Sequence, residues 1–164
     1  MKKITVRQLA FAGILAAVYA VVTILSAPIA YGAIQFRLSE ALTVLCCFTP
    51  TAVWGMVLGC LIANLFSPVS VLDVVLGAGA TLIACLLTRP IKKPWLIPIP
   101  TIAANALIVG AEIAFFTSDS AFLPAFGLNA LTVGLGEAVV MYLLGVPLFL
   151  YLRRSKAGQR LSSF

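Results

Sequence analysis

The sequence predicts an all-α integral membrane protein: a single transmembrane domain over residues 1–164, with six membrane-spanning helices and both termini in the cytoplasm. The 164 residues are 62% hydrophobic and only 10% charged, and the mean hydropathy is +1.13. Soluble domains are about half apolar and about a quarter charged, so this composition excludes an ordinary soluble domain. A crossing helix needs about 20 apolar residues, which limits the chain to about six or seven spans.

Six apolar runs give the expected helices. They cover residues 8–26, 38–48, 51–66, 73–88, 101–116 and 125–152. The first run follows a basic start, as a secretory signal does, but it is long for a signal core and Pro28 is unfavourable for cleavage, so we expect it to remain as a helix. Residues 27–36 are expected to form a loop, and residues 89–100, with four prolines, form the clearest linker.

Prolines and a capping motif define several helix ends. Pro50 and Pro68 end the second and third helices, because proline cannot continue a helix and restricts the residue before it. Pro147 predicts a kink in the last helix. Ser70 and Asp73 have the spacing of a capping box at the start of the fourth helix.

The basic residues predict the topology. Ten of the 11 lie in three clusters beside apolar runs: Lys2, Lys3 and Arg7; Arg89, Lys92 and Lys93; Arg153, Arg154, Lys156 and Arg160. The positive-inside rule places such clusters in the cytoplasm, which requires an even number of crossings between one cluster and the next. Four helices and then two satisfy this condition. We interpret the net charge of +6 in this way, and not as a nucleic-acid-binding surface.

The residues that several kinds of catalytic and metal-binding site require are absent from the sequence. The chain has no histidine, no phosphate-binding loop and no Ser/His or Cys/His pair, so we expect neither an enzyme nor a metal or cofactor site. The cysteines lie inside apolar runs without paired metal-site spacing, which favours buried small hydrophobic residues over a disulfide framework: Cys46, Cys47, Cys60 and Cys85.

Polar residues of the predicted helices gather in their outer halves. The candidate substrate-binding residues in these halves are Arg37, Glu40, Asn64, Asp73, Glu112, Asn129 and Glu137. Asn105 is a further candidate, because it lies seven residues before Glu112 and therefore on the same helix face. An ionisable group inside a span usually has a function or a partner, and a pore would need polar groups at both depths. The pattern therefore predicts an outward-facing pocket above an apolar plug. Carboxylates with several carboxamides suit a ligand rich in N–H donors, including a cation, and an outer aromatic such as Phe36 could stack on a flat ring.

Structural interpretations of the same residues remain open. Arg37 and Glu40, three residues apart, could pair with each other, and Asp73 could be only a helix cap. Asn64 and Asn105 could bridge helices, and the outer aromatics could form an interfacial belt. Glu137 is the hardest to explain structurally, because it lies too deep to reach the interface easily and has no basic residue near it in sequence.

Small residues recur at every fourth position in three of the predicted helices, a spacing that permits close helix packing. In the first helix they are Ala12, Ala16 and Ala20. That helix brings no ionisable or carboxamide group to the pocket after Gln8. We therefore expect its alanine face to be free to contact another protein.

The chain resembles the QueT family of queuosine precursor transporters. The most distinctive match is Phe36-Arg37-Leu38-Ser39-Glu40-Ala41-Leu42-Thr43, and others are residues 59–64, 72–77, 105–110 and 136–137. The resemblance implies a six-helix substrate-binding (S) component of an energy-coupling factor (ECF) transporter in a prokaryotic plasma membrane. Such a component captures a 7-deazaguanine-type base outside the cell and works with a transmembrane coupling subunit and two ATPases. The alanines of the first helix resemble the Ala-x-x-x-Ala surface that contacts the coupling subunit.

The hydrogen-bonding chemistry of a guanine-like base suggests roles for the candidate residues of the pocket. Glu137 would accept a pair of ring N–H bonds, Glu112 would meet an aminomethyl cation, and the asparagines would bind the remaining edge. A rival hypothesis is a stand-alone, proton-coupled small-molecule transporter that uses a membrane carboxylate. That protein would need a polar route to the cytoplasm, which the apolar inner halves do not supply.

Overall fold

The computed structural model describes residues 5–32, 34–67, 71–117 and 121–161. Every regular element within these residues is a helix and none is a strand, which confirms the all-α class. The α-helices are α1 (Val6–Leu25), α2 (Ala27–Ala30), α3 (Thr51–Asn64), α4 (Asp73–Thr88), α5 (Pro98–Thr117), α6 (Phe122–Val140), α7 (Val146–Arg154) and α8 (Lys156–Leu161). The 3₁₀-helices are η1 (Leu38–Cys47) and η2 (Pro94–Leu96), and η3 (Met141–Gly145) is π-helical.

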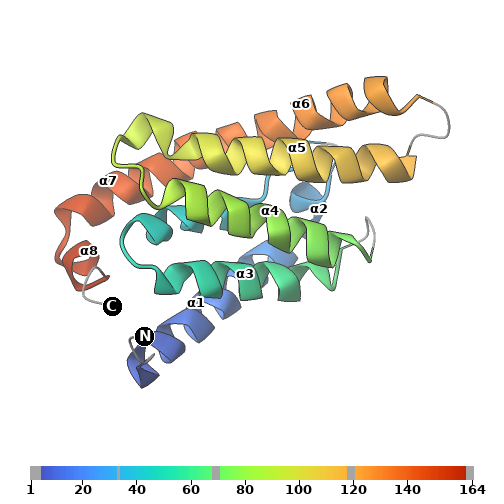
Figure 1. Ribbon diagram of the computed structural model, residues 1–164. Coiled ribbons are helices and arrows are strands. Elements are labelled where there is room, and N and C mark those ends of the chain that lie inside the picture. The colour runs from blue at the N-terminus through green and yellow to red at the C-terminus, as the bar shows by residue number, and fades with distance from the viewer. Residues whose placement is uncertain (1–4, 33, 68–70, 118–120, 162–164) are drawn as a thin grey trace.

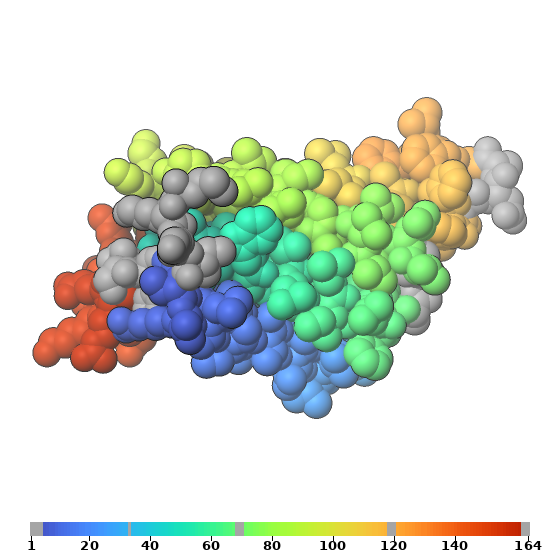
Figure 2. Space-filling model, turned by 60° about the horizontal axis from the view of Figure 1, so that its bottom comes forward, coloured from blue at the N-terminus to red at the C-terminus, as the bar shows by residue number. Residues whose placement is uncertain are grey.

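The long helices lie side by side, from α1 at one edge through α3 and α4 to α5 and α6 at the other (Figure 1). The start of α1, the connection between α4 and α5, and the end of α7 with α8 lie at one end of the bundle, which we call the basic end because these segments carry the three basic clusters. Lys2 and Lys3 lie outside the described residues. At the opposite end, α5 and α6 extend beyond the other helices (Figure 2).

Three segments are long and apolar enough to cross a membrane: Val6–Leu25, Pro94–Thr117 and Phe122–Arg154. Three shorter apolar helices are η1, α3 and α4. At 1.5 Å per residue, α3 and α4 are about 21 and 24 Å long, less than the hydrocarbon core of about 30 Å. The structure thus has the helical, apolar character that the composition predicts for a membrane protein.

Local differences from the expected boundaries have simple causes. Residues 27–30 of the expected loop form the short helix α2, with Pro28 in its first turn, where the missing N–H is tolerated. Similarly, α5 begins at Pro98, so that two prolines of the expected linker belong to its first turn. The N-cap of α4 is Leu72, without a side-chain hydrogen bond, and Ser70 of the expected capping box lies outside the described residues, as does Pro68.

The kink expected at Pro147 takes the form of a change in helix type. The π-helical η3 joins α6 to α7 immediately before this proline, and the Val146 N–H donates to the Met141 carbonyl five residues back. Because proline has no N–H to donate, the widened turn accommodates the interrupted hydrogen-bond pattern.

The alanine face of α1 is buried inside the protein, where it packs against α3. Ala12, Ala16 and Ala20 are 8%, 2% and 5% exposed. A Cβ atom added to Gly59 would lie only 2.8 Å from the Ala16 carbonyl oxygen, so the two backbones are in close contact. The expectation that this face is free for another protein is therefore wrong. The spacing of small residues predicts close packing, but α3 carries the complementary glycines and is itself the partner.

The exposed face of α1 also contains small residues, shifted along the helix from the predicted ones. Ala10, Gly13 and Ala17 are exposed, and a Cβ atom at Gly13 would have no neighbour within 4 Å. Large apolar side chains surround them on this face, among them Val6, Ile14, Val18 and Val21. This face therefore remains open to another helix or to lipid.

Candidate functional site

Of the polar side chains that are buried within the bundle, we call eight the polar cluster. None is more than 2% exposed: Tyr19, Arg37, Glu40, Asn64, Asp73, Thr81, Asn105 and Glu137. Six of the eight are candidates predicted from the sequence. Burying polar groups is costly unless they are paired, so the partners of each group decide whether it has a structural or a binding role.

Glu40 joins three elements. Its Oε1 atom accepts hydrogen bonds from the Tyr19 hydroxyl of α1 at 2.5 Å and from the Thr81 hydroxyl of α4 at 3.0 Å. Its Oε2 atom is buried and has no hydrogen-bond partner among the described residues. Glu40 is therefore held firmly on one side and retains acceptor capacity on the other.

Arg37 is a buried cation just before η1. No hydrogen bond from the described residues reaches its Nε, Nη1 or Nη2 atoms. The guanidinium lies 5.5 Å from the ring centroid of Tyr31, in a cation–π arrangement, and it interacts electrostatically with Asp73 and Glu40. Arg37 and Glu40 thus interact electrostatically, as expected from their spacing, but no hydrogen bond joins them. The five N–H donors of the guanidinium are therefore available to an acceptor.

Glu137 lies in α6, close to Arg37. A Cβ atom at the preceding Gly136 would collide with the Gln35 carbonyl, so this glycine lets the chain before η1 cross directly against α6. Glu137 interacts electrostatically with Glu40 and Arg37. Its Oε2 atom is buried without a hydrogen-bond partner among the described residues.

Asn105 lies on the face of α5 that meets η1. One turn earlier, the Thr101 hydroxyl lies 3.3 Å from that of Thr43 in η1, and residues four apart share a helix face. Both the Nδ2 and the Oδ1 atoms of Asn105 are buried without a partner among the described residues. A carboxamide in this state offers donors and an acceptor side by side.

The polar contacts of Asn64 are structural in character. Its Nδ2 atom donates to the Asp73 carbonyl at 2.8 Å, and the Tyr31 hydroxyl donates to its Oδ1 atom at 3.3 Å. These bonds tie the end of α3 to the start of α4 and to the segment after α2. They favour the helix-bridging interpretation for Asn64.

Two other predicted site residues are not members of the polar cluster. Asn129 is half-buried, and its Nδ2 atom donates to the Ala125 carbonyl of its own helix at 2.9 Å. Phe36 lines an apolar cavity of about 290 Å³, with residues that include Ile29 and Val140. The ring that contacts a charged group of the cluster is that of Tyr31.

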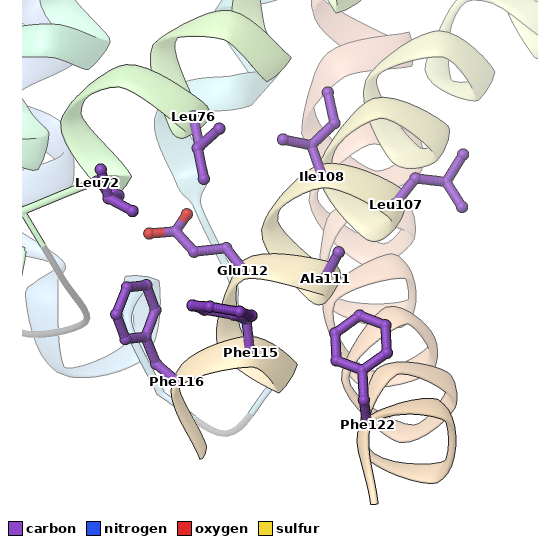
Figure 3. Close-up of a pocket in the computed structure, with 9 residues that line it drawn as sticks. All are labelled: Leu72, Leu76, Leu107, Ile108, Ala111, Glu112, Phe115, Phe116 and Phe122. Carbon is purple, nitrogen blue, oxygen red and sulfur yellow. The ribbon is translucent and has the colours of Figure 1, made fainter. Parts of the chain in front are cut away.

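Glu112 lies in a different cavity, of about 460 Å³, between α4, α5 and the start of α6 (Figure 3). Glu112 is 3% exposed, and its carboxylate points toward Leu72, the N-cap of α4, and Leu76 within α4, beside the rings of Phe115 and Phe116. All the other lining residues are apolar: Leu72, Leu76, Leu107, Ile108, Ala111, Phe115, Phe116 and Phe122. Asn105 and Glu112 are seven residues apart, so they share one face of α5 about 10 Å apart along the helix.

The described part of the chain contains neither a metal-binding cluster nor a disulfide bond. No three His, Cys, Asp or Glu residues come together there in a way that could hold a metal ion. The four cysteines are free thiols, and three of them are fully buried.

Sequence reasoning missed Tyr19 and Thr81. The signal for Tyr19 was present, because it lies three residues after Ala16 and therefore on the same face of α1. Once this face packs inward, the tyrosine hydroxyl needs a buried partner. Thr81 carries no comparable signal, since threonines are common in apolar helices and only the fold brings this one to Glu40.

Apolar helices long enough to cross a membrane, enclosing a buried cluster of charged side chains, are typical of a membrane protein whose buried charges have a function or a partner. The chain matches the QueT transporter family over residues 9–154, nearly its whole length, and it belongs to that family. This confirms the resemblance drawn from the motif around Arg37 and Glu40. No curated protein and no solved structure matches the chain.

Proposed function

We propose that the protein is the substrate-binding S component of an ECF transporter, and that it binds a queuosine precursor, a 7-deazaguanine-type base, in the polar cluster. The proposal includes six membrane spans with the basic end in the cytoplasm. The observation that carries it is the buried set of unsatisfied groups on Arg37, Glu40, Asn105 and Glu137. Membership of the QueT transporter family supports a transport role.

The hydrogen-bonding capacity of the site complements such a base. A guanine-type ring presents adjacent N–H donors on one edge, which a carboxylate such as Glu137 accepts in pairs, and a carbonyl oxygen, to which the Arg37 guanidinium donates. Asn105 supplies both a donor and an acceptor for the remaining edge. Pairing these groups with a ligand removes the penalty of leaving them buried and unsatisfied.

Glu112 is the proposed partner of a cationic substituent on the base. Its carboxylate lies in an aromatic-lined cavity, and both features favour an organic ammonium group. Its position on the same face of α5 as Asn105 suits a ligand whose ring occupies the polar cluster and whose substituent reaches toward α4 and the start of α6.

The apolar packing below the cluster supports capture over free passage. Toward the basic end, Val44, Ile97, Met141 and Phe149 form a buried apolar core. Thr43 in η1 contacts the sulfur of Met141 at 3.7 Å, directly beneath Glu40. Among the described residues this apolar core lies between a bound base and the basic end, so release of the base requires movement driven by a coupling subunit and ATPases. The stand-alone proton-coupled hypothesis would need a polar route to the cytoplasm.

The exposed face of α1 is the proposed contact for the coupling subunit. Ala10, Gly13 and Ala17 permit close approach of a second helix. In this proposal these three residues form the contact with the coupling subunit, in place of the buried Ala12, Ala16 and Ala20. The neighbouring basic end would face the cytoplasmic ATPases.

The test is equilibrium binding of 7-deazaguanine and 7-aminomethyl-7-deazaguanine to the purified, solitary protein. We expect both bases to bind and the aminomethyl base to bind more tightly. Glu112→Gln should remove most of that difference while leaving 7-deazaguanine unaffected, because only the cationic substituent meets this carboxylate. If neither base binds the wild-type protein, the proposed function is wrong. An equal effect on both bases would contradict the role of Glu112 alone.

A further inference from the structure

Helix α1 reaches the polar cluster through two buried contacts. The Tyr19 hydroxyl donates to Glu40 Oε1 at 2.5 Å, and the Thr23 hydroxyl oxygen lies 2.6 Å from that of Ser39. All four of these residues are fully buried. Both contacts end on the short stretch of η1 that directly follows Arg37.

The direction of the second bond follows from counting hydrogens. The Thr23 hydroxyl already donates its only hydrogen to the Tyr19 carbonyl at 2.9 Å. Ser39 must therefore donate to Thr23. One turn of α1, from Tyr19 to Thr23, thus donates to Glu40 and accepts from Ser39, which fixes both the position and the rotation of the start of η1 relative to α1.

The first bond also fixes the Glu40 carboxylate. The terminal torsion of a glutamate has a broad preference, so the carboxylate plane is set by its partners. Tyr19 and Thr81 approach the same oxygen from α1 and α4, and together they leave Oε2 as the acceptor for another group. Thr81 alone would be a weaker anchor, because its hydroxyl also lies 3.3 Å from the Cys60 sulfur.

We propose that Tyr19 is a positioning residue for substrate binding, which orients Glu40 and thereby makes the affinity of the polar cluster depend on the placement of α1. This inference rests on the proposed function, that the cluster binds a 7-deazaguanine-type base. The opposite face of the same helix carries Gly13 and Ala17. A protein that displaces α1 at that face would therefore disturb Tyr19 and weaken binding of the base, and bound base would weaken that displacement in return.

The test uses Tyr19→Phe, which removes one hydroxyl and keeps the ring that fills the core. We expect the dissociation constant for 7-deazaguanine to rise about tenfold, the effect of losing one buried, charge-assisted hydrogen bond. Tyr142→Phe is the matched control. Its hydroxyl is likewise a hydrogen-bond donor, but its acceptor is the backbone carbonyl of Trp95 at 3.1 Å, in another part of the structure. Its dissociation constant should equal that of the wild type.

A double-mutant cycle distinguishes positioning from general destabilisation. In a Thr81→Val background, which removes the other hydrogen bond to Glu40 Oε1, Tyr19→Phe should cost clearly more than tenfold, because neither described hydrogen bond to this carboxylate then remains. A purely structural role would instead give the same factor in both backgrounds, accompanied by a fall in the melting temperature of the ligand-free protein. Unchanged affinity in Tyr19→Phe, with a wild-type protein that binds the base, would overturn the inference and leave the proposed function standing. Failure of the wild type to bind would overturn both.

Discussion

At the scale of single residues, the charges of the polar cluster are the feature that most needs an explanation. Arg37 is the one cation among the eight cluster side chains, and Glu40, Asp73 and Glu137 are the carboxylates. Burying a guanidinium without hydrogen bonds is unfavourable. A neutral ligand with both acceptors and donors would satisfy Arg37 and the carboxylates together. This chemistry supports the proposed binding role of the cluster.

The residue-scale prediction concerns Glu137→Gln. The substitution keeps the shape of the side chain but replaces one acceptor oxygen with a donor, so one ring N–H bond is lost and two donors face each other. We expect a loss of roughly 2–4 kcal/mol, about 30-fold or more in affinity for 7-deazaguanine, measured by equilibrium binding to the purified protein.

Thr132→Ala serves as the control, since it lies on the same helix and its hydroxyl donates only to the Asn129 carbonyl of that helix at 3.1 Å. This variant should bind as the wild type does. Unchanged affinity in a correctly folded Glu137→Gln protein would make Glu137 structural.

At the scale of elements, η1 shows why a short helix can carry the site. A 3₁₀-helix has three residues per turn, so residues three apart lie in line. Arg37, which precedes η1, is followed at this spacing by Glu40 and Thr43. The Thr43 hydroxyl donates to the Glu40 carbonyl at 2.7 Å, which supports this turn locally. On one face of η1, Glu40 belongs to the polar cluster, and Thr43, one turn later, contacts Met141 of the apolar core.

The element-scale prediction compares Ala16→Trp with Ala17→Trp, two adjacent residues of α1 of which the first is buried and the second exposed. Ala16 is buried against Gly59 of α3, so Trp should overpack the core, costing at least about 1–3 kcal/mol, and should lower the melting temperature and the yield of folded protein. Ala17 is exposed, so Trp there should leave the melting temperature and base affinity within about twofold of the wild type while abolishing uptake and co-purification with the coupling subunit.

Normal uptake by Ala17→Trp cells would exclude this face of α1 as the partner contact. A fully stable Ala16→Trp protein would contradict the packing of α1 on α3.

At the scale of the whole molecule, charge and polarity are separated along the bundle. The three basic clusters belong to segments at one end (Figure 1), whereas Asn64 ends α3 and Asp73 begins α4 at the other. In the proposed orientation, with the basic end in the cytoplasm, the polar cluster would face the outside of the cell.

The prediction at this scale tests the orientation. A cysteine at Lys92, exposed between α4 and η2, should react with a membrane-impermeant thiol reagent only from the cytoplasm. A cysteine at Ser118, which lies outside the described residues between α5 and α6, should react only from the outside. The unsubstituted chain, with its largely buried cysteines, gives the background. Labelling of both positions from the same side would refute six spans.

Most of the fold followed from the sequence, because apolar length and proline position are local properties. The expected start of the fourth helix at residue 73 and the helix starting at residue 51 agree with α4 and α3. The 3₁₀ form of η1 could not be predicted, since its apolar pattern over so few residues is compatible with either kind of helix. The π-helical turn before Pro147 could not be predicted either. Proline lacks an N–H, and the way the helix accommodates the missing hydrogen bond depends on how its neighbours pack.

The sequence by itself determined the helical membrane class, the basic end and most members of the polar cluster, because a charge inside an apolar run is conspicuous wherever the run folds. The tertiary structure alone decided the partners. It brought Tyr19 and Thr81 to Glu40, separated Glu112 into its own cavity and turned the alanine face of α1 inward against α3. Helix spacing defines which residues share a face, whereas the surface that this face meets depends on elements distant in the chain.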